Sequence, residues 1–387
     1  MANKIHLAKR FKEIFNEDAQ AFYFSPGRVN LIGEHIDYHG GLVFPAALDI
    51  GTYGALSVRR DNNVAIFSEG YGDNVVTFNL INLEKDKKTA WANYARGVFA
   101  VLKEAGYVIP IGVNIYIESD MPTSAGLSSS SSLELLLLKM LSDTFNLGLS
   151  KVDIALLGKK VENEYIGVLS GIMDQFIIAH GEKDHALLLN TGTLEYQSVP
   201  LELKDYALVI VNTNKRRGLS DSKYNERYNE TMTAFKILSA YYTINHLTDL
   251  TSEDLPNIEK ILGPLTFRRV RHIITEQERT INSAKALQKG DILTFSKYLD
   301  ESHNSLRDDY EVTGIELDTL VSLLKEGGAL GARMTGAGFG GCAIGIVPKE
   351  KVENLKTFVI NEYTKKIGYE PTFFTTSISE GTHAIKE

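Results

Sequence analysis

The sequence predicts an α+β protein built from two domains. The chain has 387 residues, which exceeds the length at which a single hydrophobic core usually stops growing. Of these residues 43% are hydrophobic and 23% are charged, the proportions of an ordinary globular protein. Segments with strand and helix patterns follow one another in runs, without the regular alternation that a doubly wound sheet requires. Together these three observations favour two α+β domains.

The first half of the chain is predicted to combine a sheet with buried helices. An amphipathic helix is expected within residues 1–20, and strands are expected in AFYFSP, LVFPAAL, TYGALSV, VAIFS and VNIYIES. Helical spacing marks TAWANYARGVFAVLKEAG and KVDIALLGKKVENEYIG. Residues 128–146 form a helix that is apolar on nearly every side and must therefore be buried. HALLLN adds a further strand.

The second half is predicted to place helices on an antiparallel sheet. The strand YALVIVNT opens this unit near residue 201, which gives domains at 1–200 and 201–387. Two strands around 331–347, one more helix and a final strand FFTTSIS complete the sheet. The other predicted helices lie at about 222–243, 255–287, 291–305 and 314–326.

Charge and cysteine content exclude several classes of protein. Forty-one Lys and Arg against 49 Asp and Glu give a net charge of −8, which disfavours binding to nucleic acid. The single cysteine, Cys342, excludes an intramolecular disulfide and a thiolate metal cluster, and it fits a reducing cytoplasm. The most leucine-rich stretch, LELLLLKMLS, contains Glu134 and Lys139 and is too short to span a bilayer, so no membrane segment is expected.

A glycine-rich and serine-rich segment, PTSAGLSSSSSLELLLLKML, joins a strand to the buried helix. Its backbone N–H groups would converge at the positive end of the helix dipole, where phosphate binds. Ser131 followed by Glu134 also fits a capping box, so alone the two interpretations are equally good. Capping needs one serine, whereas Ser128–Ser132 supplies five hydroxyls behind Gly126, which favours phosphate and Mg²⁺. The segment lacks GxxxxGK[ST] and is therefore not the common P-loop.

A second glycine-rich segment, TGAGFGGCAIGIV, formally contains GxGxxG at Gly336, Gly338 and Gly341. That pattern marks dinucleotide binding only when a helix and a distant acidic residue follow it. Here a strand follows, so a tight turn of bare backbone is predicted instead. The turn could serve packing alone, which is the better interpretation in isolation, or it could lie close over phosphates or substrate.

The segment SPGRVNLIGEHIDYHGG packs a cation, two carboxylates and two histidines among four glycines, directly after a strand. His35 and His39 have the spacing of a zinc helix, but the glycines disfavour a helix and HExxH is absent. Glu34, His35 and Asp37 could instead hydrogen-bond the hydroxyls of a sugar. Carboxylates beside a sugar could also indicate glycoside hydrolysis, which the phosphate-binding segment argues against.

Taken together and in this order, the three segments resemble the GHMP family of small-molecule kinases, most closely its members that phosphorylate galactose. GRVNLIGEHIDYHGG is similar to the sugar signature, PTSAGLSSSSS to the phosphate loop and GARMTGAGFGGCAIGIV to the third motif. The likeness extends through AWANYARGV and SGIMDQF, and so over nearly the whole chain. It implies a ribosomal-S5-like N-terminal domain, a ferredoxin-like C-terminal domain and an active site between them.

The resemblance also implies a reaction. The terminal phosphoryl group of MgATP would pass to the anomeric hydroxyl of α-D-galactose, giving galactose 1-phosphate and ADP, the step that commits galactose to the Leloir pathway. Asp174 in SGIMDQF matches the catalytic aspartate of the family, and Arg28 in PGRVN matches its cationic partner. An aspartate there could accept or orient the proton of the sugar hydroxyl, while a guanidinium neutralises charge on the phosphoryl oxygens.

The resemblance assigns the binding residues as well. Expected sugar ligands are Glu34, His35, Asp37, Gly171, Asp174 and Tyr224. Expected ligands of Mg²⁺ are Ser130 and Glu162. Expected contacts of ATP are Ser68, Trp91, Tyr94, Ser124, Ala125, Gly126, Leu127, Ser128, Ser129 and Ser130.

Three positions depart from the family pattern: Ser131 replaces alanine, Ile36 replaces threonine and His39 replaces asparagine. Ile36 also occurs in relatives that phosphorylate N-acetylgalactosamine, which makes that activity an alternative. A galactose sensor, which binds sugar and ATP without turnover, is the other alternative, but an uninterrupted phosphate loop with Arg28 and Asp174 favours catalysis. The expected partners are galactose and MgATP, with no nucleic acid or membrane, and the expected protein is a cytoplasmic monomer.

Overall fold

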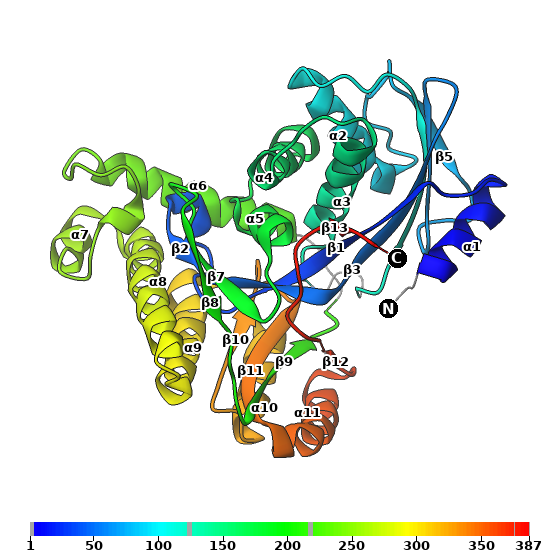
Figure 1. Cartoon of the computed structure of the whole chain (residues 1–387). Helices are drawn as coiled ribbons and strands as arrows, with labels where there is room; N and C mark the ends of the chain where they lie inside the picture. Colours follow the sequence, from blue (N-terminus) through cyan, green and yellow to red (C-terminus); the bar gives the residue numbers. More distant parts are fainter. Residues whose placement is uncertain (1–3, 122–125, 216–219, 375, 387) are drawn as a thin grey trace.

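The computed structural model describes residues 4–121, 126–215, 220–374 and 376–386, without the side chains of residues 220–222. Helices and strands are mixed throughout this part of the chain, and the strands form three sheets (Figure 1). The predicted α+β class is confirmed.

A six-stranded sheet forms the core of the first half, in the order β13-β1-β3-β6-β4-β5. Its neighbouring strands are antiparallel except for the parallel pair β4 and β6. Phe22 and Phe24 pack with helix α1 (Lys4–Phe15), whereas Tyr23 between them faces the core on the other side, as the two-residue period of a strand requires. The strands are β1 (Ala21–Asn30), β3 (Pro45–Val58), β4 (Asn63–Ser68), β5 (Val76–Asn79), β6 (Val113–Ser119) and β13 (His383–Ala384).

Helices cover the face of this sheet opposite α1 (Figure 1). They are α2 (Asn93–Glu104), α3 (Ser129–Thr144), α4 (Lys151–Lys160) and α5 (Met173–His180). The predicted buried helix is confirmed in α3, where Leu135, Leu136, Leu137 and Leu138 are fully buried. Leucines that point to every side of one helix can all be buried only when other elements surround it.

The second half is built on a four-stranded antiparallel sheet in the order β10-β11-β9-β12. The predicted helices on an antiparallel sheet are therefore confirmed. The strands are β9 (Tyr206–Asn212), β10 (Gly331–Thr335), β11 (Cys342–Pro348) and β12 (Thr372–Phe374). The helices are α6 (Ser220–Leu238), α7 (Leu255–Ile261), α8 (Pro264–Gln288), α9 (Ile292–Ser305), α10 (Ile315–Glu326) and α11 (Val352–Ile367). A third sheet contains β2 (Leu42–Val43), β7 (His185–Asn190) and β8 (Tyr196–Pro200).

Several predicted boundaries are wrong for identifiable reasons. The single helix expected over 255–287 is two helices, α7 and α8, because Pro264 begins a new helix and disfavours helical geometry at Gly263. The segment SPGRVNLIGEHIDYHGG is predicted to lie directly after a strand, but its first residues belong to the strand, since β1 continues to Asn30 with a register shift between Pro26 and Arg28. The last predicted strand is shortened to β12.

Two helices continue into short π-helical segments, which the sequence did not predict. The segment η3 (Val161–Ile166) follows α4, and η5 (Leu306–Tyr310) follows α9. π-Helical turns occur frequently at functional sites, because the extra residue changes the direction of the side chains. Glu162 lies in the first of these segments and Tyr310 in the second.

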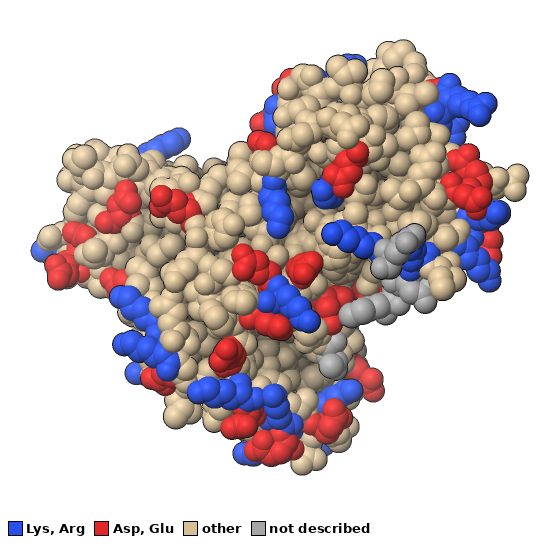
Figure 2. All heavy atoms as spheres, in the orientation of Figure 1, with Lys and Arg blue, Asp and Glu red and all other residues tan. Residues whose placement is uncertain are grey.

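The end of the chain returns to the first sheet, where β13 pairs with β1 through Tyr23–Ala384 and Phe24–His383. The two termini consequently lie on the same side of the molecule (Figure 1). The division of the chain at residue 200 stays a prediction. Acidic and basic side chains are interspersed over the face shown in Figure 2. Among the described residues, no helix has the length and apolar character needed to cross a membrane.

Candidate active site

Segments that are far apart in the sequence meet around one pocket of about 210 Å³. The segment with Arg28, the start of α3 and the turn between β10 and β11 all contribute, as the resemblance implied. Its lining residues are Arg28, Glu34, His35, Asp37, Tyr94, Gly126, Ser128, Ser129, Ser130, Glu162, Val168, Ser170, Gly171, Met173, Asp174, Tyr224, Gly336, Ala337 and Gly338.

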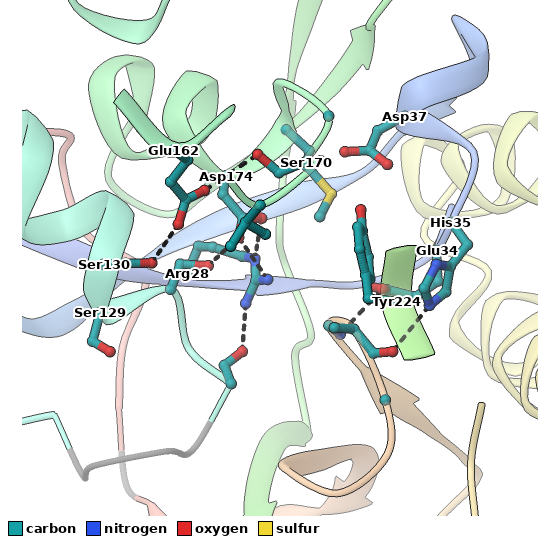
Figure 3. Close-up of a pocket in the computed structure, with 18 of the residues that line it drawn as sticks. Arg28, Glu34, His35, Asp37, Ser129, Ser130, Glu162, Ser170, Asp174 and Tyr224 are labelled. Carbon is teal, nitrogen blue, oxygen red and sulfur yellow. Dashed lines mark hydrogen bonds and ion pairs between the residues drawn. The ribbon is translucent and has the colours of Figure 1, made fainter. Parts of the chain in front are cut away.

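An arginine and an aspartate are paired at the centre of the pocket (Figure 3). Arg28 Nε donates to Asp174 Oδ1 at 2.7 Å and Arg28 Nη2 donates to Asp174 Oδ2 at 3.0 Å, the bidentate geometry of a strong ion pair. Burial acts to lower the pKa of Arg28, but the negative charges of Asp174 and Glu34 outweigh it and raise that pKa. Arg28 is therefore a permanent cation, and its side chain fixes the orientation of the carboxylate.

The phosphate-loop segment is attached to this pair. Arg28 Nη1 donates to the carbonyl oxygen of Gly126 at 2.7 Å, and Ser128 Oγ donates to Asp174 Oδ2 at 2.5 Å. Ser128 adopts a left-handed conformation, with φ of 64°, immediately before α3. A Cβ on Gly336 would lie 3.1 Å from the Gly126 oxygen, so the glycine turn approaches this loop closely.

The capping-box interpretation of the serine run is wrong. Helix α3 begins at Ser129, and its N-cap residue Ser128 makes no side-chain capping hydrogen bond. Ser131 lies inside the helix and is almost fully buried with Glu134. Because the N-cap hydroxyl turns to Asp174, the first N–H groups of α3 keep the anion-binding character of an uncapped helix start.

Two carboxylates lie on the far side of the pair from this helix. Glu34 is nearly fully buried, accepts from Asn30 Nδ2 at 2.7 Å and from Gly336 N at 3.1 Å, and has its pKa raised by burial. For Asp37, burial together with the charges of Asp174 and Glu34 raises the pKa to about 7. These oxygens are suited to accept hydrogen bonds from the hydroxyls of a neutral ligand.

His35 lines the pocket with both ring nitrogens already bonded to protein. Nε2 lies 3.1 Å from the carbonyl oxygen of Ala337 and must carry a proton, because a carbonyl only accepts. Burial lowers the pKa of His35 to about 3, so the ring is neutral and Nδ1 accepts from the Tyr38 hydroxyl at 3.0 Å. Tyr38 in turn lies 2.6 Å from the Tyr310 hydroxyl. The ring thus ties the sugar-signature loop to the glycine turn.

Ser130 and Glu162 form a pair of oxygen donors beside the phosphate loop. Ser130 Oγ donates to Glu162 Oε1 at 2.7 Å, and burial raises the pKa of Glu162. Among the described residues, no group of three or more His, Cys, Asp and Glu could hold a metal ion. Two hard oxygen donors that leave most ligand positions to phosphate and water fit Mg²⁺.

The remaining predicted site residues divide into three groups. Gly171, Tyr224 and Tyr94 line the pocket, and a Cβ on Gly171 would overlap Asp37 Oδ2 at 1.9 Å. Ser68, Trp91 and Leu127 do not line it: Ser68 ends β4, Trp91 lies in η2 (Ala90–Ala92) with its ring 5.9 Å from Tyr71, and Leu127 is buried. Ser124 and Ala125 lie outside the described residues.

Sequence reasoning missed several lining residues. Ser170 and Met173 flank the predicted Gly171 and Asp174, so proximity in SGIMDQF was the available signal. Gly336, Ala337 and Gly338 were recognised only as a turn that could lie over substrate. Val168 offered no signal.

Phosphoryl transfer to an alcohol needs a helix start that binds phosphate, a carboxylate paired with a cation, and groups that bind the hydroxyls of the acceptor. The pocket has residues suited to all three roles. Three family models match the chain: the galactokinase galactose-binding signature at residues 9–58, the GHMP kinase N-terminal domain at 93–182 and the GHMP kinase C-terminal domain at 283–365. The fold and the site therefore define a kinase of the GHMP class, and the two-domain GHMP fold implied by the resemblance is confirmed.

Comparison with individual proteins shows to which family within the GHMP class the chain belongs. A galactokinase of Clostridium beijerinckii is 47% identical over 100% of both chains, and a galactokinase of Ligilactobacillus salivarius is 47% identical over 97% of this chain and 98% of its own. The structure of Lactococcus lactis galactokinase complexed with galactose matches with a TM-score of 0.95 at 45% identity, over 98% of this chain and 99% of that one. A mevalonate kinase at 22% identity and a TM-score of 0.66 shares the fold alone. The chain belongs to the galactokinase family.

Proposed function

We propose that the enzyme transfers the γ-phosphoryl group of ATP to the anomeric hydroxyl of α-D-galactose, forming α-D-galactose 1-phosphate and ADP. One observation carries this assignment. Asp174 and Arg28 lie between the phosphate-binding residues Ser129, Ser130 and Glu162 on one side and Glu34, Asp37 and Tyr224 on the other (Figure 3). A hydroxyl of a sugar held at the second group would meet a phosphoryl group held at the first.

At the acceptor hydroxyl, Asp174 is the group that takes or orients the proton. The anomeric oxygen attacks phosphorus and the bond from phosphorus to the β-phosphate oxygen breaks, while the hydroxyl proton moves to the Asp174 carboxylate. Arg28 cannot accept this proton. Its guanidinium holds both carboxylate oxygens and supplies positive charge beside the transferred group.

At the donor, the start of α3 would hold the phosphates and Tyr94 would lie near the nucleoside. Ser130 and Glu162 would hold Mg²⁺. When bound there, the ion would neutralise part of the negative charge of the phosphates. Ser68, Trp91, Ser124, Ala125 and Leu127 remain proposed contacts of the nucleotide.

The sugar would be held by Glu34, Asp37, Tyr224, the backbone of Gly171 and Asp174. His35 is proposed to shape this end of the pocket, since both its nitrogens have protein partners. Ile36 was the reason to consider N-acetylgalactosamine, but its side chain is fully buried and does not line the pocket. Galactose is thus the better-supported substrate.

A coupled assay of ADP release across a panel of hexoses tests the assignment. Turnover with galactose well above that with glucose and N-acetylgalactosamine is expected. Faster turnover with the acetylated sugar would overturn the choice of substrate, and folded protein that binds galactose without releasing ADP would point to the sensor. We further propose a cytoplasmic monomer with domains at 1–200 and 201–387, for which light scattering would check the mass.

A further inference from the structure

A buried glutamine lies directly behind the proposed metal ligand. Gln175 follows Asp174 on α5, and its side chain is fully buried. Its Nε2 donates to Glu162 Oε2 at 2.9 Å and to Ser131 Oγ at 3.2 Å. One amide therefore joins three elements: α5, the π-helical segment η3 and the phosphate-loop helix α3.

These bonds fix the orientation of the Glu162 carboxylate. Oε1 accepts from Ser130, while Oε2 accepts from Gln175 and, at 3.2 Å, from Ser170 Oγ. A glutamate on a short π-helical segment has several rotamers, and bonds to both oxygens select one of them. The selected rotamer places Glu162 on the wall of the pocket beside Ser130.

The packing around Gln175 is arranged to admit its side chain. A Cβ on Gly158 of α4 would lie 3.2 Å from Gln175 Cγ and 2.5 Å from Leu135 Cδ1, so only a glycine allows α4 to approach this closely. The surroundings contain few donors, since Gln175 Oε1 and both oxygens of Glu134 accept no hydrogen bond from any described residue.

An amide suits this position for an electrostatic reason. It donates to the carboxylate without adding charge, whereas a carboxylate would repel Glu162 and a cation would compete with a metal ion for it. Residues that hold a metal ligand in this way typically change metal affinity about 10- to 100-fold when they are removed.

We propose that Gln175 is a positioning residue that holds Glu162 in the orientation required to bind the metal ion of MgATP; the inference rests on the function proposed above. Gln175 touches neither sugar nor phosphate in this role. Its loss should weaken the contribution of the metal ion to nucleotide binding. It should not affect the sugar end of the pocket, which is the side lined by Glu34, Asp37 and Tyr224.

The test compares ADP binding by calorimetry in excess Mg²⁺ and in EDTA. Gln175→Met removes both hydrogen bonds at similar side-chain length. We expect the Kd for ADP to rise about 10-fold in Mg²⁺ and to stay unchanged in EDTA. The free Mg²⁺ needed for the half-maximal rate should rise, while the KM for galactose stays that of the wild type. Gln175→Glu should show a larger loss in Mg²⁺, because it adds repulsion.

Matched variants separate the possible failures. Gln277→Met, which loses only a bond from Leu42 N outside the pocket, should leave Mg²⁺-dependent binding unchanged. If Glu162→Gln leaves the Mg²⁺-dependent binding of ADP unchanged, Glu162 is not a metal ligand and the proposed metal site is wrong. If Glu162→Gln abolishes it and Gln175→Met does not weaken it, the inference about Gln175 is overturned. Should Gln175→Met fail to fold, Gln175→Asn withdraws the amide by one methylene and must give the same change, or the inference is equally overturned.

Discussion

At the scale of single residues, the hydrogen bonds around Asp174 lead us to expect that this residue is needed for the phosphoryl transfer but not for nucleotide binding. Asp174 is the only described group that meets Arg28, Ser128 and the middle of the pocket at once. The first N–H groups of α3 and the side chain of Ser130 do not depend on the charge of Asp174. Loss of that charge should therefore stop the reaction without emptying the nucleotide site.

Asp174→Asn is expected to lower kcat about 10²- to 10⁴-fold, because an amide cannot accept the hydroxyl proton. The Kd for ADP in Mg²⁺ should change less than about threefold. ADP-release kinetics and calorimetry measure the two quantities. Asp143→Asn, at a carboxylate that interacts with Lys139 and Tyr23 outside the pocket, is the matched control. A wild-type rate in Asp174→Asn would reject the role.

Protonation of Asp37 should make kcat/KM for galactose fall as the pH drops below about 7, and this fall is the acid limb of the pH profile. The charges of Asp174 and Glu34 and its burial raise the pKa of Asp37 to about 7 in the ligand-free protein. Only the ionised carboxylate accepts hydrogen bonds fully, so kcat/KM for galactose should fall up to about tenfold per pH step below 7. Asp37→Asn should remove this limb and lower kcat/KM at pH 8. A profile that is flat from pH 5.5 to 8 in the wild type would contradict the assignment.

The raised pKa of Asp37 should lower activity at acid pH but increase the stability of the folded protein there. The folded-state pKa of Asp37 lies above its ordinary value of 3.8, so the folded protein binds this proton more tightly than the unfolded chain. Stability from Asp37 is present below pH 4 and is lost as the pH rises to 7. Asp37→Asn should therefore raise Tm by about 2 °C or more at pH 8 and by less at pH 5.

The charge of Lys159 lowers the pKa of Asp37, and the two residues line a second cavity of about 230 Å³ next to the proposed sugar-binding side of the pocket. Lys159→Met should move the acid limb of kcat/KM to higher pH. The adjacent Lys160 instead pairs with Glu104 and Glu164, so Lys160→Met should leave the limb in place. Equal profiles for the two variants would show that Lys159 has no influence on Asp37.

At the scale of elements, the turn into α5 presents backbone to the sugar end. Gly171 lies two residues before α5, where any Cβ would overlap Asp37 Oδ2. Gly171→Ala must therefore displace Asp37 or shift the turn. We expect the KM for galactose to rise about tenfold or more while the Kd for ADP stays within about twofold. Gly263→Ala, which like Gly171 has no positive φ but has no atom within 4 Å of the added Cβ, separates the loss of a glycine from the displacement of Asp37. An unchanged KM in Gly171→Ala would exclude this contact.

At the scale of the whole molecule, the end of the chain supports the active-site helix. Thr382 N donates to Ile178 O in α5 at 2.7 Å, Thr382 Oγ1 lies 2.8 Å from Ser25 Oγ, and Ile385 N donates to Phe22 O at 2.8 Å. These bonds join β1, which carries Arg28, to α5, which carries Asp174. The last residues thus hold together the two elements that present the proposed catalytic pair.

Deletion of residues 382–387 should lower the free energy of unfolding by about 2–4 kcal/mol, because several buried hydrogen bonds are lost together. Denaturant unfolding measures this change. Deletion of residues 386 and 387 alone keeps these three bonds and should have little effect. Equal stability of the two truncated chains would contradict the structural role of β13.

Local pattern and sequence motifs predicted much of this protein. The leucines of α3 indicated a buried helix, and the stretches rich in β-forming side chains in β1, β3 and β6 indicated strands. The order of three motifs indicated the kinase family and most of the pocket. These features depend on residues that are near one another in the chain, where side-chain period, glycine and proline act directly on backbone geometry. The split at Pro264 was readable from the same rules and was overlooked.

Tertiary structure decided the rest. Arg28 and Asp174 are 146 positions apart, and no local pattern reveals that their side chains meet or that Arg28 also holds Gly126. The internal bonding of His35, the pKa of Asp37 and the contact of Gln175 with Glu162 depend on burial and on partners from distant segments. Hydrogen bonds between distant segments and the loss of water around a charge exist only after the chain has folded, which is why sequence determined the family and the parts of the site while the fold determined how those parts act on one another.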